Sequence, residues 1–138
     1  MQDLSLHVLD VVENSINAGS KRVEVRIVAD EKADLLRLLI ADDGRGMGEE
    51  ELEKARDPFY TSKPGKRIGL GIPLLAQAAR EGGGEFSIRS TVGDGTVLEA
   101  SFIMSHPDTK PLGDIAGTMR MLQVAHPEIE FVFEQQTT

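Results

Sequence analysis

Cysteine and tryptophan are absent from this 138-residue chain, and its aromatic side chains are five phenylalanines and one tyrosine. Without cysteine there is no disulfide framework and no thiolate metal site. No apolar run approaches the roughly 20 residues that a membrane-spanning helix needs. The first residues are acidic and helix-patterned, unlike a basic segment followed by an apolar one. We therefore expect a cytoplasmic protein with no membrane partner.

Positive charge is also scarce. Fifteen basic residues against 23 acidic ones give a net charge of −8 at neutral pH. Such a surface repels a phosphate backbone over most of its area, which argues against a nucleic-acid partner. The length fits one domain that buries about two thirds of its unfolded surface. We therefore expect a single domain over residues 1–138, with any anion site confined to a local cluster.

Residues 42–47 (Asp-Asp-Gly-Arg-Gly-Met) follow directly on the apolar run 35–41, which predicts a buried strand that ends in a polar corner. Gly44 and Gly46 permit backbone angles closed to other residues and let a ligand approach the main chain. The Asp42 carboxylate can accept a hydrogen bond from a planar amine, such as the exocyclic amino group of a purine. An ordinary Asp-Gly turn would explain the same hexapeptide, so its meaning depends on the motifs around it.

Residues 3–18 have the apolar period of a helix packed on a core, and their polar side has an unusual composition. One narrow stripe contains His7, Asp10, Asn14 and Asn17. Solvated helix faces usually carry Lys and Glu, because those residues form helices better than Asp and Asn do. The stripe therefore favours a functional face over a merely solvated one. His7 alone is interpreted as a surface or packing histidine, since a lone imidazole is weak evidence for catalysis.

Two later stretches have the composition of an anion site. Residues 57–67 contain two prolines and three cations without an apolar period, which favours a lid over an anion against a solubilising loop. Gly69-Leu70-Gly71 then opens a helix with Pro73 in its first turn. Glycines at a helix N-terminus free backbone amides to hold a phosphate. Taken alone this is a weak signal, neither a Walker loop nor a complete dinucleotide fingerprint.

The rest of the chain predicts two hairpins, two further helices and a last strand. Leu74, Leu75, Ala78 and Ala79 are expected on the buried side of the helix that Gly71 opens. The expected segments are strands 23–27 and 35–41, helix 49–56, strands 86–90 and 96–104 around a turn at 93–95, helix 112–122 and edge strand 129–133.

Taken in order, these blocks resemble the GHKL superfamily of ATP-binding domains, which is shared by DNA gyrase B, the HSP90 chaperones, sensor histidine kinases and MutL-type repair proteins. The blocks are a carboxylate four residues before an asparagine, Asp-x-Gly-x-Gly, a cation-bearing lid, Gly-Leu-Gly and Gly-x-Gly-Thr. The resemblance runs from about Leu4 to Phe102. It implies an α+β fold, a Bergerat-type two-layer sandwich with a mixed, mostly antiparallel sheet and helices on one face. The core would span about 4–104, with an extra helix and edge strand in 105–138.

The resemblance also implies roles for the matched residues. Asn14 would bind the Mg²⁺ that bridges the ATP phosphates, Asp42 would take the adenine amino group, and Gly46 would line the adenine pocket. Lys63 would cover the phosphates from the lid, and Thr96 would sit behind the adenine. Gly69, Leu70 and Gly71 would meet the phosphates through backbone amides. The other expected nucleotide contacts are Asn17, Gly44, Met47 and Arg67.

Within the superfamily the chain looks most like histidine-kinase catalytic domains and anti-sigma-factor kinases, through residues 57–63 and 83–96. It departs from the pattern at Asp10, where ATP-hydrolysing relatives carry glutamate, and at Arg67, where kinases usually have glycine. We therefore expect a stand-alone regulatory domain that binds ATP or ADP with Mg²⁺ and hydrolyses ATP weakly or not at all, with Asp10 as the candidate catalytic residue. It would pass the γ-phosphoryl group to an unidentified protein partner. The alternative is a non-catalytic, nucleotide-gated interaction module.

Overall fold

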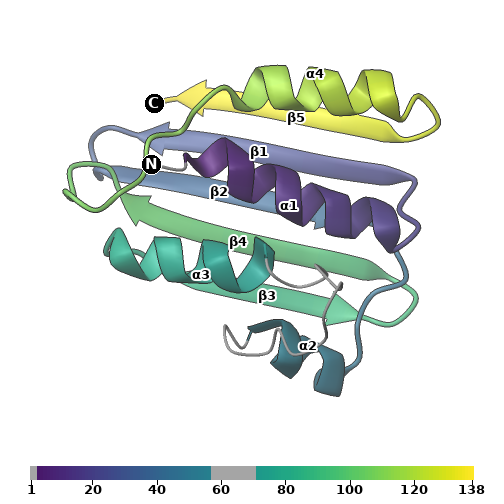
Figure 1. Ribbon diagram of the computed structural model, residues 1–138. Helices are drawn as coiled ribbons and strands as arrows, with labels where there is room; N and C mark the ends of the chain where they lie inside the picture. Colours follow the sequence, from purple (N-terminus) through teal and green to yellow (C-terminus); the bar gives the residue numbers. More distant parts are fainter. Residues whose placement is uncertain (1–2, 57–70) are drawn as a thin grey trace.

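A five-stranded β-sheet forms one layer of the molecule, and helices cover one of its faces (Figure 1). The computed structural model describes residues 3–56 and 71–138. The expected lid residues 57–67, together with Gly69 and Leu70, lie outside that description. The described elements are α1 (Leu4–Asn17), β1 (Arg22–Asp30), β2 (Leu35–Asp42), α2 (Glu49–Arg56), α3 (Gly71–Glu81), β3 (Phe86–Thr91), β4 (Gly95–Ile103), α4 (Ile115–Ala125) and β5 (Glu130–Thr137).

The strands lie in the order β3-β4-β2-β1-β5, and four of them form antiparallel pairs. β5 instead runs parallel to β1, because the chain returns through α4 before it enters the sheet. The sheet is therefore mixed and mostly antiparallel, and the predicted α+β sandwich is confirmed. The last strand lies at the edge, as expected, and extends to Thr137. None of the described helices is long and apolar enough to cross a membrane.

Alternation along the strands places the core between the sheet and the helices. In β1, for example, Val23, Val25 and Ile27 are buried while Arg26 is exposed. The apolar stripe of α1 packs on this layer. Leu74 was wrongly assigned to the buried side of α3: it is 40% exposed, whereas Leu75, Ala78 and Ala79 are buried. Leu74 lies about 100° around the helix from Leu75, which turns it out of the contact with α1 and the sheet.

His7 belongs to the core, so of the two interpretations, a surface histidine or a packing histidine, the structure supports the second. It is 3% exposed, and its Nε2 has no hydrogen-bond partner among the described residues. Burial lowers the pKa of this imidazole, and nearby Lys110 lowers it further against the opposing effect of Asp10 and Asp3. A proton on His7 is therefore unfavourable in the folded state.

This burial predicts a pH dependence of stability. The unfolded histidine takes up its proton near pH 6.5 and the folded one only at lower pH, so the parent should lose stability as the pH falls below about 6.5. His7→Leu removes both the titrating group and the unpaired nitrogen. Urea unfolding between about pH 8 and pH 5 should show a smaller loss for this variant than for the parent. Identical pH profiles would contradict the assignment.

Candidate functional site

Asp42 is the last residue of β2, and both of its carboxylate oxygens are held by protein donors. Oδ2 accepts a hydrogen bond from the Ser15 hydroxyl at 2.6 Å, and Oδ1 accepts one from the Gly44 N–H at 2.9 Å. Ser15 is buried in α1, so the helix fixes one side of the carboxylate. A carboxylate has about four acceptor positions. Asp42 is therefore oriented by its neighbours and can still accept from a ligand.

The corner after β2 is closed by backbone contacts that only glycine permits. Gly46 has φ +73°, and a Cβ there would lie 2.0 Å from the carbonyl oxygen of Thr91. Gly95 opens β4 with φ +109°, and its Cβ would lie 2.0 Å from the carbonyl oxygen of Asp42. Gly44 is different, because space alone requires it: a Cβ would lie 2.8 Å from Ser20 Oγ. The corner thus lies tightly against the turn that joins β3 and β4.

Ser90 connects the corner to Thr96. Its hydroxyl oxygen accepts a hydrogen bond from the Met47 N–H at 2.8 Å and lies 2.7 Å from Thr96 Oγ1. Thr96 stands opposite Asp42 in the pairing of β4 with β2. The structure therefore brings Asp42, Gly44, Gly46, Met47 and Thr96 together at one end of the sheet.

Asp43 has a different role from its neighbour. Its Oδ1 accepts hydrogen bonds from the backbone N–H groups of Lys21, at 2.8 Å, and Arg22, at 3.0 Å. The bonds from Arg22 and Lys21 lower the pKa of this carboxyl group. Asp43 thus anchors the corner to the start of β1.

The start of α3 lies against the middle of α1. A Cβ on Gly71 would be 2.8 Å from the Cβ of Asp10 and 3.0 Å from the backbone nitrogen of Val11. Asp10 is exposed, and Asn14 follows it one helical turn later as a half-buried side chain. A helix N-terminus attracts anions through its free amides and its dipole. The predicted positions Asp10, Asn14 and Gly71 therefore share one region between the two helices.

Five further residues were predicted to contact the nucleotide, and the structure describes one of them, Asn17. Asn17 is exposed at the end of α1, where its carbonyl oxygen accepts a hydrogen bond from Arg45 Nη1 at 3.3 Å. This places Asn17 beside the corner after β2. Lys63, Arg67, Gly69 and Leu70 lie outside the described residues.

Sequence reasoning assigned no site role to Ser15 or Ser90, although both position predicted residues. A signal for each was present. Ser15 falls within the buried stripe of α1, four residues after Val11, and Ser90 continues the alternation that begins with Phe86 and Ile88. Each serine is a polar residue at a position where the period favours an apolar one.

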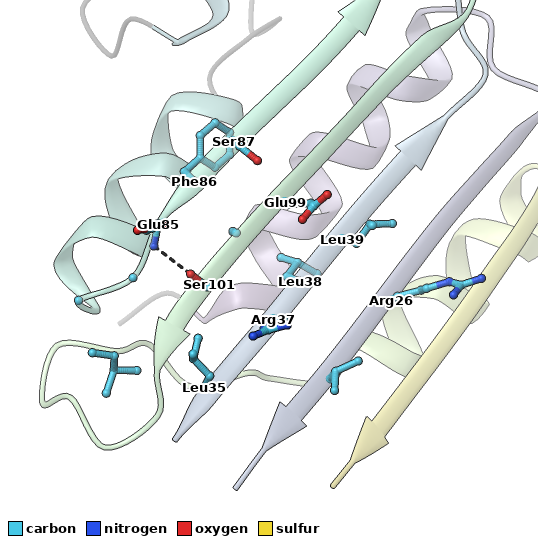
Figure 2. Close-up of a pocket in the computed structure, with 15 residues that line it drawn as sticks. Arg26, Leu35, Arg37, Leu38, Leu39, Glu85, Phe86, Ser87, Glu99 and Ser101 are labelled. Carbon is cyan, nitrogen blue, oxygen red and sulfur yellow. Dashed lines mark hydrogen bonds between the residues drawn. The ribbon is translucent and has the colours of Figure 1, made fainter. Parts of the chain in front are cut away.

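The opposite face of the sheet carries a hollow of about 620 Å³ that is separate from this site. Figure 2 shows Arg26, Arg37, Leu39 and Glu99 among the side chains over it. None of the predicted nucleotide contacts that the structure describes lines this hollow. The candidate site is therefore on the helix-covered side of the sheet, between α1, the corner after β2 and the start of α3.

Comparisons with known proteins identify the family and support the fold. Sporulation kinase C of Bacillus subtilis is 33% identical over 91 residues, which cover 66% of this chain and 21% of the relative. Sensor protein kinase FleS of Pseudomonas aeruginosa is 34% identical over 109 residues, which cover 78% and 26%. The chain thus spans about a fifth to a quarter of the length of these relatives.

Among solved structures, the Aquifex aeolicus MutL ATPase domain complexed with ADP superposes with a TM-score of 0.61 at 19% identity, over 93% of this chain and 57% of that one. This likeness supports the fold. A profile of the family described as histidine kinase-, DNA gyrase B-, and HSP90-like ATPase matches residues 2–107. Because that match covers most of the sequence, the chain belongs to this family, as a GHKL ATP-binding domain close to those of histidine kinases.

Proposed function

We propose that Asp42 recognises adenine by accepting a hydrogen bond from its exocyclic amino group. The observation that carries this proposal is the orientation of the carboxylate by Ser15 and Gly44, which leaves acceptor capacity for a ligand. A charged acceptor makes a stronger hydrogen bond than a neutral one. Gly44, Gly46 and Met47 would line the base, Thr96 would lie behind it, and Asn17 would contact the nucleotide at the end of α1.

We further propose that the phosphates lie between α1 and the start of α3. Gly69, Leu70 and Gly71 would offer backbone amides, and Lys63 and Arg67 would supply positive charge. Asn14 fits a magnesium site here, because Mg²⁺ bound to phosphates keeps several waters and needs few protein oxygens. Among the described residues there is no group of three or more His, Cys, Asp or Glu side chains that could hold a metal. The ion would neutralise phosphate charge.

The proposed reaction is transfer of the γ-phosphoryl group to a side chain of a protein partner in the cytoplasm, in a regulatory role. Support comes from Asp10, which lies beside Gly71 but has a carboxylate one methylene shorter than glutamate. A general base must come within hydrogen-bond reach of the attacking water, and a misplacement of about 1 Å can reduce the rate about a hundredfold. Asp10 would therefore activate the attacking water poorly, and bound ATP would be hydrolysed slowly.

Asp10→Glu tests this proposal. The longer carboxylate should raise the steady-state rate of ATP hydrolysis by about tenfold or more, while Asp10→Asn should bind ATP as the parent does and hydrolyse no faster. The exposed position of Asp10 leaves room for the added methylene. A parent that already turns over about once per second, or an Asp10→Glu variant that binds ATP without a faster rate, would contradict the role.

The non-catalytic alternative is favoured by the same short carboxylate, since slow hydrolysis also suits a switch that is read by a partner. Incubation with γ-labelled ATP and co-purifying proteins separates the two proposals. Label on a partner supports transfer. Partner binding that depends on ATP, without label on any protein, supports the interaction module.

A further inference from the structure

The outer edge of β5 is not paired with another strand among the described residues. The Glu130 N–H bonds to the carbonyl of Lys21 at 2.9 Å and the Thr138 N–H bonds to that of Ala29 at 2.8 Å, both toward β1. Backbone groups alternate in direction along a strand, so those of the odd-numbered residues point away from β1. Figure 1 shows this side of β5 at the margin of the sheet.

Within the described part of the chain, hydrogen-bond partners are found only at the beginning of this edge. The Phe131 N–H donates to Gln123 Oε1 at 3.2 Å, and Gln123 Nε2 donates to the carbonyl of Ile129 at 2.7 Å. The amide side chain of α4 thus occupies the place of a neighbouring strand. Beyond it, the outward backbone groups of Phe133, Gln135 and Thr137 have no partner among the described residues. Such an edge is a template for another strand.

Charge on β5 is compatible with a second copy of the same strand. Glu130 lies 3.4 Å from Arg22, and Glu134 lies 3.7 Å from Arg26, on the face of the sheet without helices. Figure 2 shows Arg26 next to β5 on that face. Each acidic residue of the edge strand is therefore partly neutralised by an arginine of β1. This reduces the repulsion that two such strands would otherwise have.

We propose that β5 pairs antiparallel with β5 of a second copy, centred on Gln135, so that the two sheets become continuous. In this register Gln135 faces Gln135 of the second copy, and Phe133 faces Thr137. This pairing uses backbone groups that have no partner among the residues described, and Gln123 keeps its bonds. A pairing centred on Glu134 would set two glutamates directly opposite, which is destabilising. A pairing centred on Phe133 would require the Phe131 N–H that Gln123 already holds.

The chosen register also places Glu134 across from Gln136 of the second copy, with no like charges opposite. Both α4 and β5 lie beyond residues 2–107, the segment that matches the family profile. The proposed interface therefore belongs to the part of the chain that adds to the ATP-binding domain. It uses none of the predicted nucleotide contacts.

Sedimentation of the full chain between about 1 µM and 1 mM tests the interface. The parent should form a dimer within this range, more readily at higher salt, since each copy carries a net charge of −8. Gln135→Pro removes only an outward N–H, which an edge strand tolerates, and should be monomeric throughout. Gln135→Thr keeps the N–H and should dimerise as the parent does. A parent that is monomeric at the highest concentration, or a Gln135→Pro variant that dimerises equally well, would overturn the proposal.

Charge changes give a second test that does not depend on proline being tolerated. Gln136→Glu places like charges opposite each other at two symmetric positions and should raise the dimer dissociation constant on the order of threefold or more, while Gln136→Lys should lower it. Gln77→Glu and Gln77→Lys make the same net changes at an exposed position of α3 and serve as controls. Equal effects at positions 77 and 136 would show that the interface is elsewhere.

Discussion

Asp42→Asn is expected to weaken ATP binding by about 1.5–3 kcal/mol, roughly a tenfold to hundredfold rise in Kd, while the domain remains folded. The variant loses the charge that strengthens the bond to the adenine amino group. It keeps its local contacts, because the asparagine carbonyl can still accept from Gly44 and its amide can donate to Ser15 Oγ. Ser15 would then donate to the carbonyl of Val11, which lies 3.4 Å away.

Asp43→Asn is the matched control for this measurement. It removes the same charge from the adjacent residue. In the parent, the Asp43 carboxylate accepts hydrogen bonds from backbone N–H groups at the start of β1 and is not expected to contact the nucleotide. Asp43→Asn should therefore lower the free energy of unfolding and leave ATP affinity nearly unchanged. Calorimetric titration of both variants decides the matter. The assignment fails if Asp42→Asn binds ATP as the parent does, or if the two variants lose affinity equally.

Gly46→Ala is expected to have the largest effect on stability, about 3 kcal/mol or more, together with loss of ATP binding. The added Cβ would lie 2.0 Å from the carbonyl oxygen of Thr91, a backbone atom that cannot rotate away. The corner after β2 would have to separate from the β3–β4 turn. This would displace Met47 from Ser90 and disturb the surroundings of Thr96.

Gly93→Ala separates the contact from the backbone strain. Gly93 also has a positive φ, +90°, but nothing lies within 4 Å of the position that its Cβ would occupy. Only the conformational penalty of about 1–2 kcal/mol should appear in this variant. Urea unfolding of both variants measures the difference. Similar losses at positions 46 and 93 would mean that the contact with Thr91 does not hold the corner.

Period and turn chemistry predicted the individual helices, strands and turns, because these depend on local sequence, whereas the fold class was implied by the family resemblance. The alternation in β1, the apolar run of β2, the glycine-rich corner and the apolar stripe of α1 all appear in the structure. The parallel pairing of β5 with β1 is a long-range contact that no local period encodes. Leu74 was misplaced for a related reason: helical spacing places it near the apolar stripe, but only the packed neighbours decide where the stripe ends.

The sequence predicted the site residues that are expected to contact the nucleotide themselves. It did not predict the residues that only hold those contacts in place. Asp42 and the glycines stand out in the sequence as a motif. Ser15 and Ser90 act through hydrogen bonds to residues 27 and 43 positions away, respectively. Such partners become visible only when the strands and α1 are placed side by side. The approach of Gly71 to Asp10 is likewise a property of the packing of α1 and α3.

The most direct test of the central claim is calorimetric titration of the parent with ATP and with GTP, each in the presence of magnesium. Guanine has no amino group at the position where adenine presents one to Asp42, so the site should leave an acceptor unpaired when GTP binds. We predict that ATP binds and that GTP binds at least about tenfold more weakly. Equal affinities for the two nucleotides would contradict the account of Asp42 as the residue that recognises adenine.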